Sequence, residues 1–382
     1  MNEPLKILHV TPSFYPAVVY GGPIYSLYSL CQSLVRQGCR IRVLTTDANG
    51  PDSVLDVDTG KDVEVSPGVF VRYCHRVKDV SVSPTFLRLL VPQVRWADVI
   101  HLMAVYSFPT IPTLLTCKMI GKPVVWSTRG MLQRWEGNRR RTLKTIWESI
   151  CQIVSPNRLV LHATSQEEAT ENERRLPGVE TVVVPNGVEI SKNVANTRHN
   201  EWLRLLYLGR IDPKKGIENL LRAYQIVSED LGTMSHLVIA GAGEQRYSET
   251  IRKLIEELGL AQKVKMVGHV VGDAKEMLFQ TSDVVIVPSY TENFGLVIAE
   301  ALAHAIPVIA SRGTPWKCLE DVGCGLWVDN DPNSLAAAIK RIKSKPLREM
   351  GLKGREWIQR EFAKDSIAEK MVRVYRTLSR AS

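Results

Sequence analysis

The sequence predicts an α/β fold with two doubly wound, Rossmann-like domains and a C-terminal helix that packs back on the first domain. Short, nearly continuous apolar runs alternate with helical segments, which is typical of a parallel sheet covered on both faces. The polar stretch 189–200 interrupts this series, which then restarts. The last helical segment carries one apolar stripe, which needs a surface to pack on.

The first series predicts an N-terminal domain over residues 1–195. Residues 5–11 form its first strand, and residues 23–37 form a helix with Pro23 in the first turn. After a looser section the apolar runs resume. The further predicted strands are 39–46, 97–102, 123–127, 159–163 and 181–184.

The second series predicts a C-terminal domain over residues 196–362. A helix, or a turn and then a helix, follows each of its strands. The predicted strands are 203–208, 236–240, 264–267, 284–287 and 308–310. Residues 363–382 are the predicted last helix, whose stripe consists of Ile367, Met371, Val374 and Leu378.

Length and composition exclude several classes of protein. A chain of 382 residues allows two domains of ordinary size, and its 45% hydrophobic and 23% charged residues are typical of a folded protein. Seven scattered cysteines without C-x-x-C spacing argue against a disulfide framework or a structural zinc and favour a cytoplasmic location. No run approaches the roughly 20 apolar residues of a membrane span.

The net charge of +9 is unevenly distributed. Residues 122–144 hold seven basic side chains against one acid, Glu136. Arg140, Lys144 and Trp147 recur at helical spacing and predict a basic helix face that carries a tryptophan. We expect this face to dock on an anionic membrane, at the inner side of the plasma membrane. The alternative is a solvated basic face with Trp147 in the core.

The basic residues expected at this membrane surface are Arg139, Arg140, Arg141 and Lys144. Nucleic acid is a less suitable partner, because neither a stacking platform nor an RNA-binding module accompanies the charge.

A first candidate binding motif follows the first strand of the second domain. Gly209 and Arg210 lie at the strand end, and Lys215 lies just before a helix start. In doubly wound sheets ligands bind at the carboxyl ends of strands. Two cations and free backbone amides suit a diphosphate there. The alternative is an exposed basic turn.

A second candidate motif follows the strand at 284–287. Glu292 precedes a helix whose first turn holds the amides of Phe294, Gly295 and Leu296, which favours an anion. Glu300 lies inside the otherwise apolar helix, where a carboxylate needs a partner such as a ribose diol. The two carboxylates of a glycosidase are a weaker explanation, because the surrounding features bind anions.

Two pairs of glycines lead to different predictions about phosphate binding. Gly21 and Gly22 lie in a long strand-to-helix loop that can place amides on a phosphate. Gly241 and Gly243 form only a fragment of a dinucleotide fingerprint, because the third glycine is absent. No cluster of histidine or cysteine indicates a metal site.

Together these motifs resemble glycosyltransferase family 4, whose GT-B fold has two facing Rossmann-like domains. The resemblance covers nearly the whole chain, and its order and spacing are more specific than any single motif. The segments that carry it are 21–23, 162–165 with Glu168, 184–188, 209–216, 267–270, and the E-x(7)-E block from Glu292 to Glu300.

The resemblance implies a retaining, metal-independent hexosyltransferase without a cofactor, in which a UDP- or GDP-linked sugar is the donor substrate. The acceptor is a glycan or a lipid-linked glycan in surface polysaccharide biosynthesis, and the first domain binds it. Arg210 and Lys215 hold the diphosphate with help from the backbone at Gly22, and Glu300 holds the ribose. The remaining implied donor contacts are Gly268, His269 and Val270 at the base, and Glu292, Asn293, Phe294, Gly295 and Leu296 at the sugar and phosphate.

One segment departs from the common family pattern. Many members have a histidine before a glycine where this chain has Arg129, Gly130, Met131 and Leu132, as in a bacterial polysaccharide-assembly subgroup. We therefore expect Arg129, together with Asn186, to contact the acceptor or a phosphate, or Arg129 to brace its loop. A non-hydrolysing nucleotide-sugar epimerase and a catalytically lapsed nucleotide-sugar-binding scaffold remain alternative functions.

Overall fold

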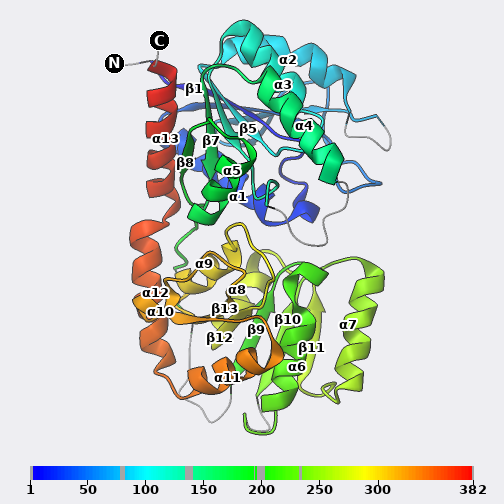
Figure 1. Cartoon of the computed structure of the whole chain (residues 1–382), viewed down its shortest axis with the longest axis vertical. Coiled ribbons are helices and arrows are strands. Elements are labelled where there is room, and N and C mark those ends of the chain that lie inside the picture. The colour runs from blue at the N-terminus through cyan, green and yellow to red at the C-terminus, as the bar shows by residue number, and fades with distance from the viewer. Residues whose placement is uncertain are drawn as a thin grey trace. The chain divides into compact units, whose positions relative to one another are not determined.

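The computed structural model describes residues 3–77, 82–133, 141–192, 194–195, 203–231 and 235–380. The chain divides into two compact units (Figure 1). Unit 1 holds residues Met1–Gly187 and Lys364–Ser382, and unit 2 holds Val188–Ala363. Each unit is an open parallel sheet with helices on both faces, so the two Rossmann-like domains expected from the sequence are present.

Unit 1 contains an eight-stranded sheet with the order β3-β4-β2-β1-β5-β6-β7-β8. Every described pair of neighbours is parallel except β3 with β4. Its strands are β1 (Lys6–Val10), β2 (Arg40–Thr46), β3 (Val63–Ser66), β4 (Val69–Cys74), β5 (Val99–Met103), β6 (Val124–Ser127), β7 (Leu159–Ala163) and β8 (Thr181–Val183). Its helices are η1 (Val18–Tyr20), α1 (Gly22–Arg36), α2 (Pro84–Trp96), α3 (Thr110–Ile120), α4 (Arg141–Val154), α5 (Gln166–Arg175) and α13 (Lys364–Arg380).

Two apolar layers cover this sheet. Helices α1 and α13 pack on one face, around Ile7, Val43 and Val99. Helices α2, α3 and α4 pack on the other, around Leu8 and Trp126. Alternate residues of each strand enter opposite layers, as the two-residue repeat of a strand requires.

The C-terminal helix α13 returns to unit 1, as predicted (Figure 1). Ile367, Met371 and Leu378 of the predicted stripe are buried against the sheet, together with Tyr375. Arg36 of α1 and Asp365 of α13 add an exposed ion pair of 2.7 Å.

Unit 2 contains a six-stranded parallel sheet with the order β11-β10-β9-β12-β13-β14. Its strands are β9 (Arg204–Leu208), β10 (His236–Ala240), β11 (Val264–Gly268), β12 (Val284–Val287), β13 (Val308–Ser311) and β14 (Gly325–Val328). Its helices are η2 (Pro213–Lys215), α6 (Ile217–Val227), α7 (Gln245–Glu257), α8 (Gly272–Gln280), α9 (Leu296–Ala303), α10 (Leu319–Val322), α11 (Pro332–Lys343) and α12 (Leu347–Glu361).

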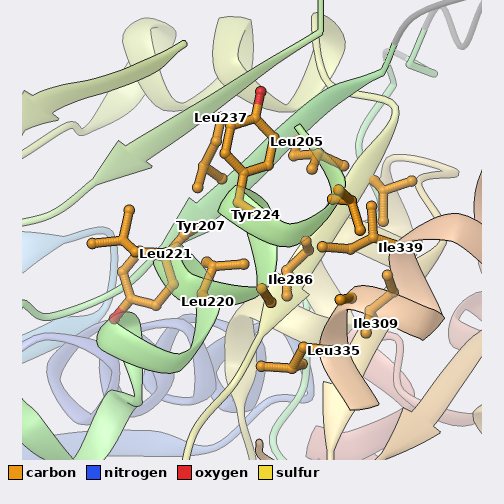
Figure 2. Close-up of a cluster of buried hydrophobic side chains, with 14 of the residues drawn as sticks. Leu205, Tyr207, Leu220, Leu221, Tyr224, Leu237, Ile286, Ile309, Leu335 and Ile339 are labelled. Carbon is orange, nitrogen blue, oxygen red and sulfur yellow. The ribbon is translucent and has the colours of Figure 1, made fainter. Parts of the chain in front are cut away.

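The core of unit 2 also has two layers. Figure 2 shows the layer beneath α6 and α11, where Tyr207, Leu220 and Tyr224 pack with strand residues such as Leu237 and Ile286. Helices α8, α9 and α12 enclose the other layer, which includes Phe279 and Trp316.

Three details of the sequence-based assignment are corrected by the structure. The boundary lies after Gly187 rather than after residue 195, because the segment from Val188 packs on unit 2. The amide of Val188 donates to the Phe362 carbonyl (2.9 Å), and the amide of Ala195 donates to the His304 carbonyl (2.8 Å). The described part of the stretch 189–200 is therefore attached to unit 2 and is not a free linker.

The other two corrections concern strands. The looser section after residue 50 contains β3 and β4, an antiparallel hairpin closed at Gly68. In β3, the apolar residues Val63 and Val65 alternate with Glu64 and Ser66, which is the strand pattern that could have revealed the hairpin. Strand β14 at the edge of the second sheet was also missed, because its four residues are too short for a periodic signal.

Candidate active site

The loop after β9 brings three cations together at the carboxyl end of the sheet. Arg210 is exposed and has neither an ion-pair nor a hydrogen-bond partner for its side chain in the described part of the chain. Burial, and then the neighbouring charges of Lys215 and Arg210, lower the pKa of Lys214. The predicted pair of Arg210 and Lys215 therefore lies in one cationic cluster, to which Lys214 belongs as well.

Two glycines that follow β10 let the neighbouring loop run beside this cluster. A Cβ atom on Gly241 would lie 1.7 Å from the Gly209 carbonyl oxygen, and one on Gly243 would lie 1.9 Å from that of Ile211. The amide of Gly209 donates to Ala240 (3.0 Å), and that of Ile211 donates to Ala242 (2.9 Å). The fingerprint fragment thus has a packing role: it allows two strand-end loops to lie edge to edge.

An ion pair joins the loop after β12 to the same cationic cluster. Lys215 Nζ forms an ion pair with Glu292 Oε1, which also accepts from Ser289 Oγ (2.8 Å). Gly216 has a φ of +62°, and a Cβ atom there would lie 2.2 Å from the Pro288 carbonyl oxygen. The ends of β9 and β12 therefore meet closely, which places Glu292 beside Lys215.

Helix α9 begins at this point. Gly295 precedes it with a φ of +75°, and Leu296 is its first residue. Phe294 is buried, and its carbonyl accepts from the indole N–H of Trp316. The first turn of the helix thus follows directly on the Glu292 loop, so its unsatisfied amides and positive dipole end lie at the same edge of the sheet as the cations.

Glu300 has a protein partner that the sequence did not reveal. Its Oε1 atom lies 2.6 Å from the Nζ atom of Lys275 on α8, and both side chains are partly exposed. Helix α8 follows the predicted base segment, in which His269 is exposed and Gly268 ends β11. The pair leaves Glu300 Oε2 without a hydrogen-bond partner among the described residues, so this atom remains available as an acceptor.

The predicted site residues of unit 1 are Gly22, Arg129 and Asn186. Gly22 is exposed at the first position of α1 and follows Gly21, whose φ is +73°. Arg129 follows β6, and its Nη1 atom donates to Asn186 Oδ1 (2.7 Å). Burial lowers the pKa of Arg129.

A buried carboxylate fixes the loop that carries Arg129. Glu168 Oε1 accepts from the Thr128 hydroxyl (2.9 Å) and the Gly130 amide (2.6 Å), and Oε2 accepts from the Thr164 amide (2.6 Å). Between those contacts Arg129 adopts a φ of +53°. A non-glycine residue in this conformation is strained, and such strain persists where the surrounding contacts impose it, often at functional sites.

Sequence reasoning missed a chain of buried polar groups beneath this loop. Tyr375 Oη lies 2.6 Å from His101 Nδ1, and His101 Nε2 lies 2.6 Å from Ser127 Oγ. The chain continues from Ser127 to His162 Nδ1 (2.5 Å) and from His162 Nε2 to the Val184 carbonyl (2.8 Å). It links α13 to three adjacent strands.

His9 lies next to this chain with its ring centroid 4.9 Å from that of His101. Neither of its ring nitrogens has a hydrogen-bond partner among the described residues. Burial, reinforced by the charge of Arg129, lowers the pKa of His9 to about 3 and that of His162 to about 4. A histidine within each of β1, β5 and β7 was the signal in the sequence.

For Trp147, the structure agrees with the alternative prediction, in which this side chain packs in the core. The Trp147 indole N–H donates to the Val105 carbonyl (2.8 Å), and the ring packs against the core of unit 1. Lys144 Nζ lies 4.8 Å from the centre of the Tyr106 ring, so both side chains contact the protein. Arg139 and Arg140 lie outside the described residues, as does the side chain of Arg141.

Within the part of the chain that the structure describes, no helix is long and apolar enough to cross a bilayer. The same residues contain no group of three histidine, cysteine or acidic side chains placed to hold a metal ion.

Two family models match the two halves of the chain. Residues 20–192 match the model described as Glycosyltransferase Family 4, and residues 190–357 match the one described as Glycosyl transferases group 1.

Curated relatives match the chain in part or nearly throughout. An uncharacterized glycosyltransferase of Methanocaldococcus jannaschii is 34% identical over 45% of this chain and 44% of its own length, so the chain spans less than half of that relative. A GDP-mannose:cellobiosyl-diphosphopolyprenol alpha-mannosyltransferase of Xanthomonas oryzae is 25% identical over 87% of this chain and 86% of its own.

A solved structure has the same fold throughout. Sucrose-phosphate synthase from Thermosynechococcus elongatus superposes with a TM-score of 0.78, covering 99% of this chain and 100% of that one at 22% identity.

Proposed function

Because the chain belongs to the GT-B glycosyltransferases of the family 4 type, we propose that it transfers a hexose from a nucleotide-diphosphate sugar to a glycan or lipid-linked acceptor. The observation that carries this proposal is the edge of unit 2, where Arg210, Lys214 and Lys215 of the loop after β9 lie beside the Glu292 loop that leads into α9. The donor is UDP- or GDP-linked, and the reaction retains the anomeric configuration without a metal.

The chemistry of the departing group explains why cations are needed there. As the glycosidic bond breaks, negative charge develops on the nucleoside diphosphate. Arg210 is charged at every relevant pH and has no competing partner among the described side chains, so it can neutralise that charge where other transferases use a divalent ion. Each preorganised donor of this kind contributes about 3 kcal/mol to the stabilisation of the transition state.

The two glutamates have distinct roles in this proposal. Glu292 Oε1 is already engaged by Lys215 and Ser289, so Glu292 holds the lysine in position and offers Oε2 to a sugar hydroxyl. The second glutamate, Glu300, accepts from the ribose hydroxyls through Oε2 while Lys275 holds Oε1. The segment from Gly268 to Val270 lines the pocket for the base, and the backbone of Asn293 to Leu296 contacts the phosphate and sugar.

Unit 1 supplies the acceptor side. Arg129, whose guanidinium donates to Asn186, is the proposed contact for a phosphate of the acceptor. The contact of the Gly22 backbone with the donor diphosphate stays a prediction. The Xanthomonas relative is named for an acceptor that carries a diphosphopolyprenol. That name supports a lipid-linked acceptor. We propose that this acceptor belongs to surface polysaccharide assembly and that the protein acts in the cytoplasm, at the inner face of the plasma membrane.

The test is a transfer assay with purified protein, a panel of UDP-, GDP- and ADP-sugars, and a polyprenyl-diphosphate glycan, with EDTA present. We expect one donor to be consumed only when the acceptor is present, and the product to keep the donor's anomeric configuration. Conversion of the donor to an epimer without acceptor would establish the alternative epimerase. Tight donor binding without turnover on any acceptor would establish a lapsed scaffold.

A thermal-shift screen identifies the donor before that assay. A ligand at 100 times its dissociation constant stabilises a protein by about 2.7 kcal/mol, which is easily detected as a rise in melting temperature.

A further inference from the structure

Helix α4 carries an exposed apolar stripe that no part of the described structure covers. Leu143, Ile146, Ile150 and Ile153 are exposed to 62, 53, 39 and 71%. They recur at spacings of three or four residues and therefore lie along one side of the helix. Single exposed apolar residues are normal on a protein surface, but a row of four large ones marks an interaction surface.

The stripe lies outside the apolar surface by which α4 packs on the core of unit 1. Trp147 and Cys151 of α4 pack into the core of unit 1. At 100° per residue, these inward residues and the stripe together span an apolar arc of about 160°, which is wider than the stripe of roughly 100° typical of a surface helix. The outward half of that arc therefore has no structural role within unit 1.

The charges around the stripe select its partner. The polar residues of α4 that are exposed are the neutral Thr142, Thr145, Ser149 and Gln152. Glu148, the one carboxylate of the helix, is buried and paired with Arg175. The exposed surface of α4 therefore offers no negative charge to repel an anionic surface.

Basic residues lie beside the carboxyl end of the stripe. Next to its carboxyl end, exposed Lys118 of α3 donates to the Ile153 carbonyl (2.6 Å), and Arg158 donates to the Gly121 carbonyl (2.7 Å). The sequence before its amino end contains Arg139 and Arg140. An apolar stripe with cations beside it and no exposed carboxylate on its helix is the pattern of a helix that lies in the interface of an anionic bilayer.

We propose that α4 docks unit 1 on an anionic membrane by inserting Leu143, Ile146, Ile150 and Ile153 among the acyl chains. This surface replaces the face of Lys144 and Trp147 that the sequence suggested. The inference adds to the proposed function by giving the enzyme access to a lipid-linked acceptor, but membrane binding itself requires neither substrate.

The test compares wild-type protein with the double variant Ile146→Glu/Ile150→Glu in vesicle flotation, without donor or acceptor. We expect wild type to float with vesicles of phosphatidylcholine and phosphatidylglycerol and to remain below with phosphatidylcholine alone. The double variant loses two inserted apolar side chains and gains two like charges, so its partition coefficient falls by more than about tenfold.

The matched control is Ile226→Glu/Leu352→Glu, which changes two exposed apolar helix residues of unit 2. We expect it to float as wild type does. Unchanged melting temperatures show that both variants fold, because all four positions are exposed. Equal flotation of the α4 variant and wild type, or equal loss in the control, would overturn the proposal.

A second copy of the chain is the rival occupant of the stripe. Sedimentation velocity without vesicles separates the two cases: a wild-type dimer that the α4 variant dissociates, with no vesicle binding, would replace the membrane by a self-interface. Failure of the transferase proposal would look different, because the protein would float on anionic vesicles and yet consume no donor.

Discussion

The Nζ atom of Lys275 lies 2.6 Å from Oε1 of Glu300, so a cation from α8 neutralises the one carboxylate of α9. A glutamate within an apolar helix needs a partner, and the sequence suggested a ribose. The protein supplies a partner of its own, and the ribose would use the other carboxylate oxygen.

We expect Glu300→Ala to abolish transfer, lowering kcat/KM by more than about 100-fold, while the fold stays intact. The ion pair with Lys275 is partly exposed, and pairs of this kind contribute about 0–1 kcal/mol to stability. The measurement is a transfer assay beside a thermal melt. Glu276→Ala is the control, because Glu276 also lies on α8 but pairs with His304. Full activity of Glu300→Ala would refute the assignment of the ribose site.

We expect Arg210→Ala to lower kcat by about 100-fold and to leave the melting temperature unchanged. The loss corresponds to about 3 kcal/mol of stabilisation of the departing diphosphate. The stability is unaffected because the side chain is exposed and has no ion-pair partner in the described chain. Arg252→Ala, an exposed arginine of α7, should keep full activity. Equal rates for the two variants would show that Arg210 has no catalytic role.

We expect the substitutions of Lys215 and Glu292 to compensate each other in the free energy of unfolding but not in activity. Each side chain is about 15% exposed, so Lys215→Met or Glu292→Gln alone leaves a largely buried polar group unpaired, at a cost of about 1–3 kcal/mol. The double variant should regain part of that stability and none of the activity. Chemical denaturation and initial rates of all four proteins complete the cycle. Strictly additive changes in unfolding free energy would show that the ion pair is not formed.

The main features of the fold were predictable because its signals are local. Strands such as β7 and β12 are continuous apolar runs, and the stripe of α13 repeats at helical spacing. The hairpin of β3 and β4 was missed because only its alternation of apolar and polar residues marks it. The boundary near Val188 depends on backbone contacts with Phe362, which the sequence does not encode locally.

The site was predictable where one motif contains both partners and not where partners are distant in sequence. Arg210 and Lys215 share one loop, so their proximity follows from the strand end. Lys275 is 25 residues from Glu300 in the sequence. Their contact depends on how α8 packs on α9, which the sequence alone does not indicate. Trp147 shows a different limit of the sequence. Helical spacing indicates which residues share one face of a helix, but it does not indicate whether that face is directed into the core.

We expect the free energy of unfolding to decrease as the pH falls from 6.5 to about 4, and to be insensitive to histidine above 6.5. His9 and His162 stay neutral in the folded protein down to a pKa of about 3 and about 4, whereas in the unfolded chain they take up protons below 6.5. The unfolded state therefore binds more protons in this window, which destabilises the fold by roughly 1–3 kcal/mol per histidine.

The variant that isolates this effect is His9→Phe, since neither ring nitrogen of His9 has a hydrogen-bond partner among the described residues. Denaturant titrations at several pH values should show a shallower acid slope for it than for wild type. His269→Phe is the control, because the His269 side chain is exposed. An identical slope for His9→Phe and wild type would contradict the burial of His9 in its neutral form.

The most direct test of the donor site is calorimetric titration of the protein with UDP and with GDP in the presence of EDTA. The account predicts that one nucleoside diphosphate binds without metal, and that Arg210→Ala and Glu300→Ala each weaken binding at least about tenfold, a loss of about 1.4 kcal/mol. Nucleotide affinity that is unchanged in both variants, or that appears only when a divalent cation is added, would contradict it.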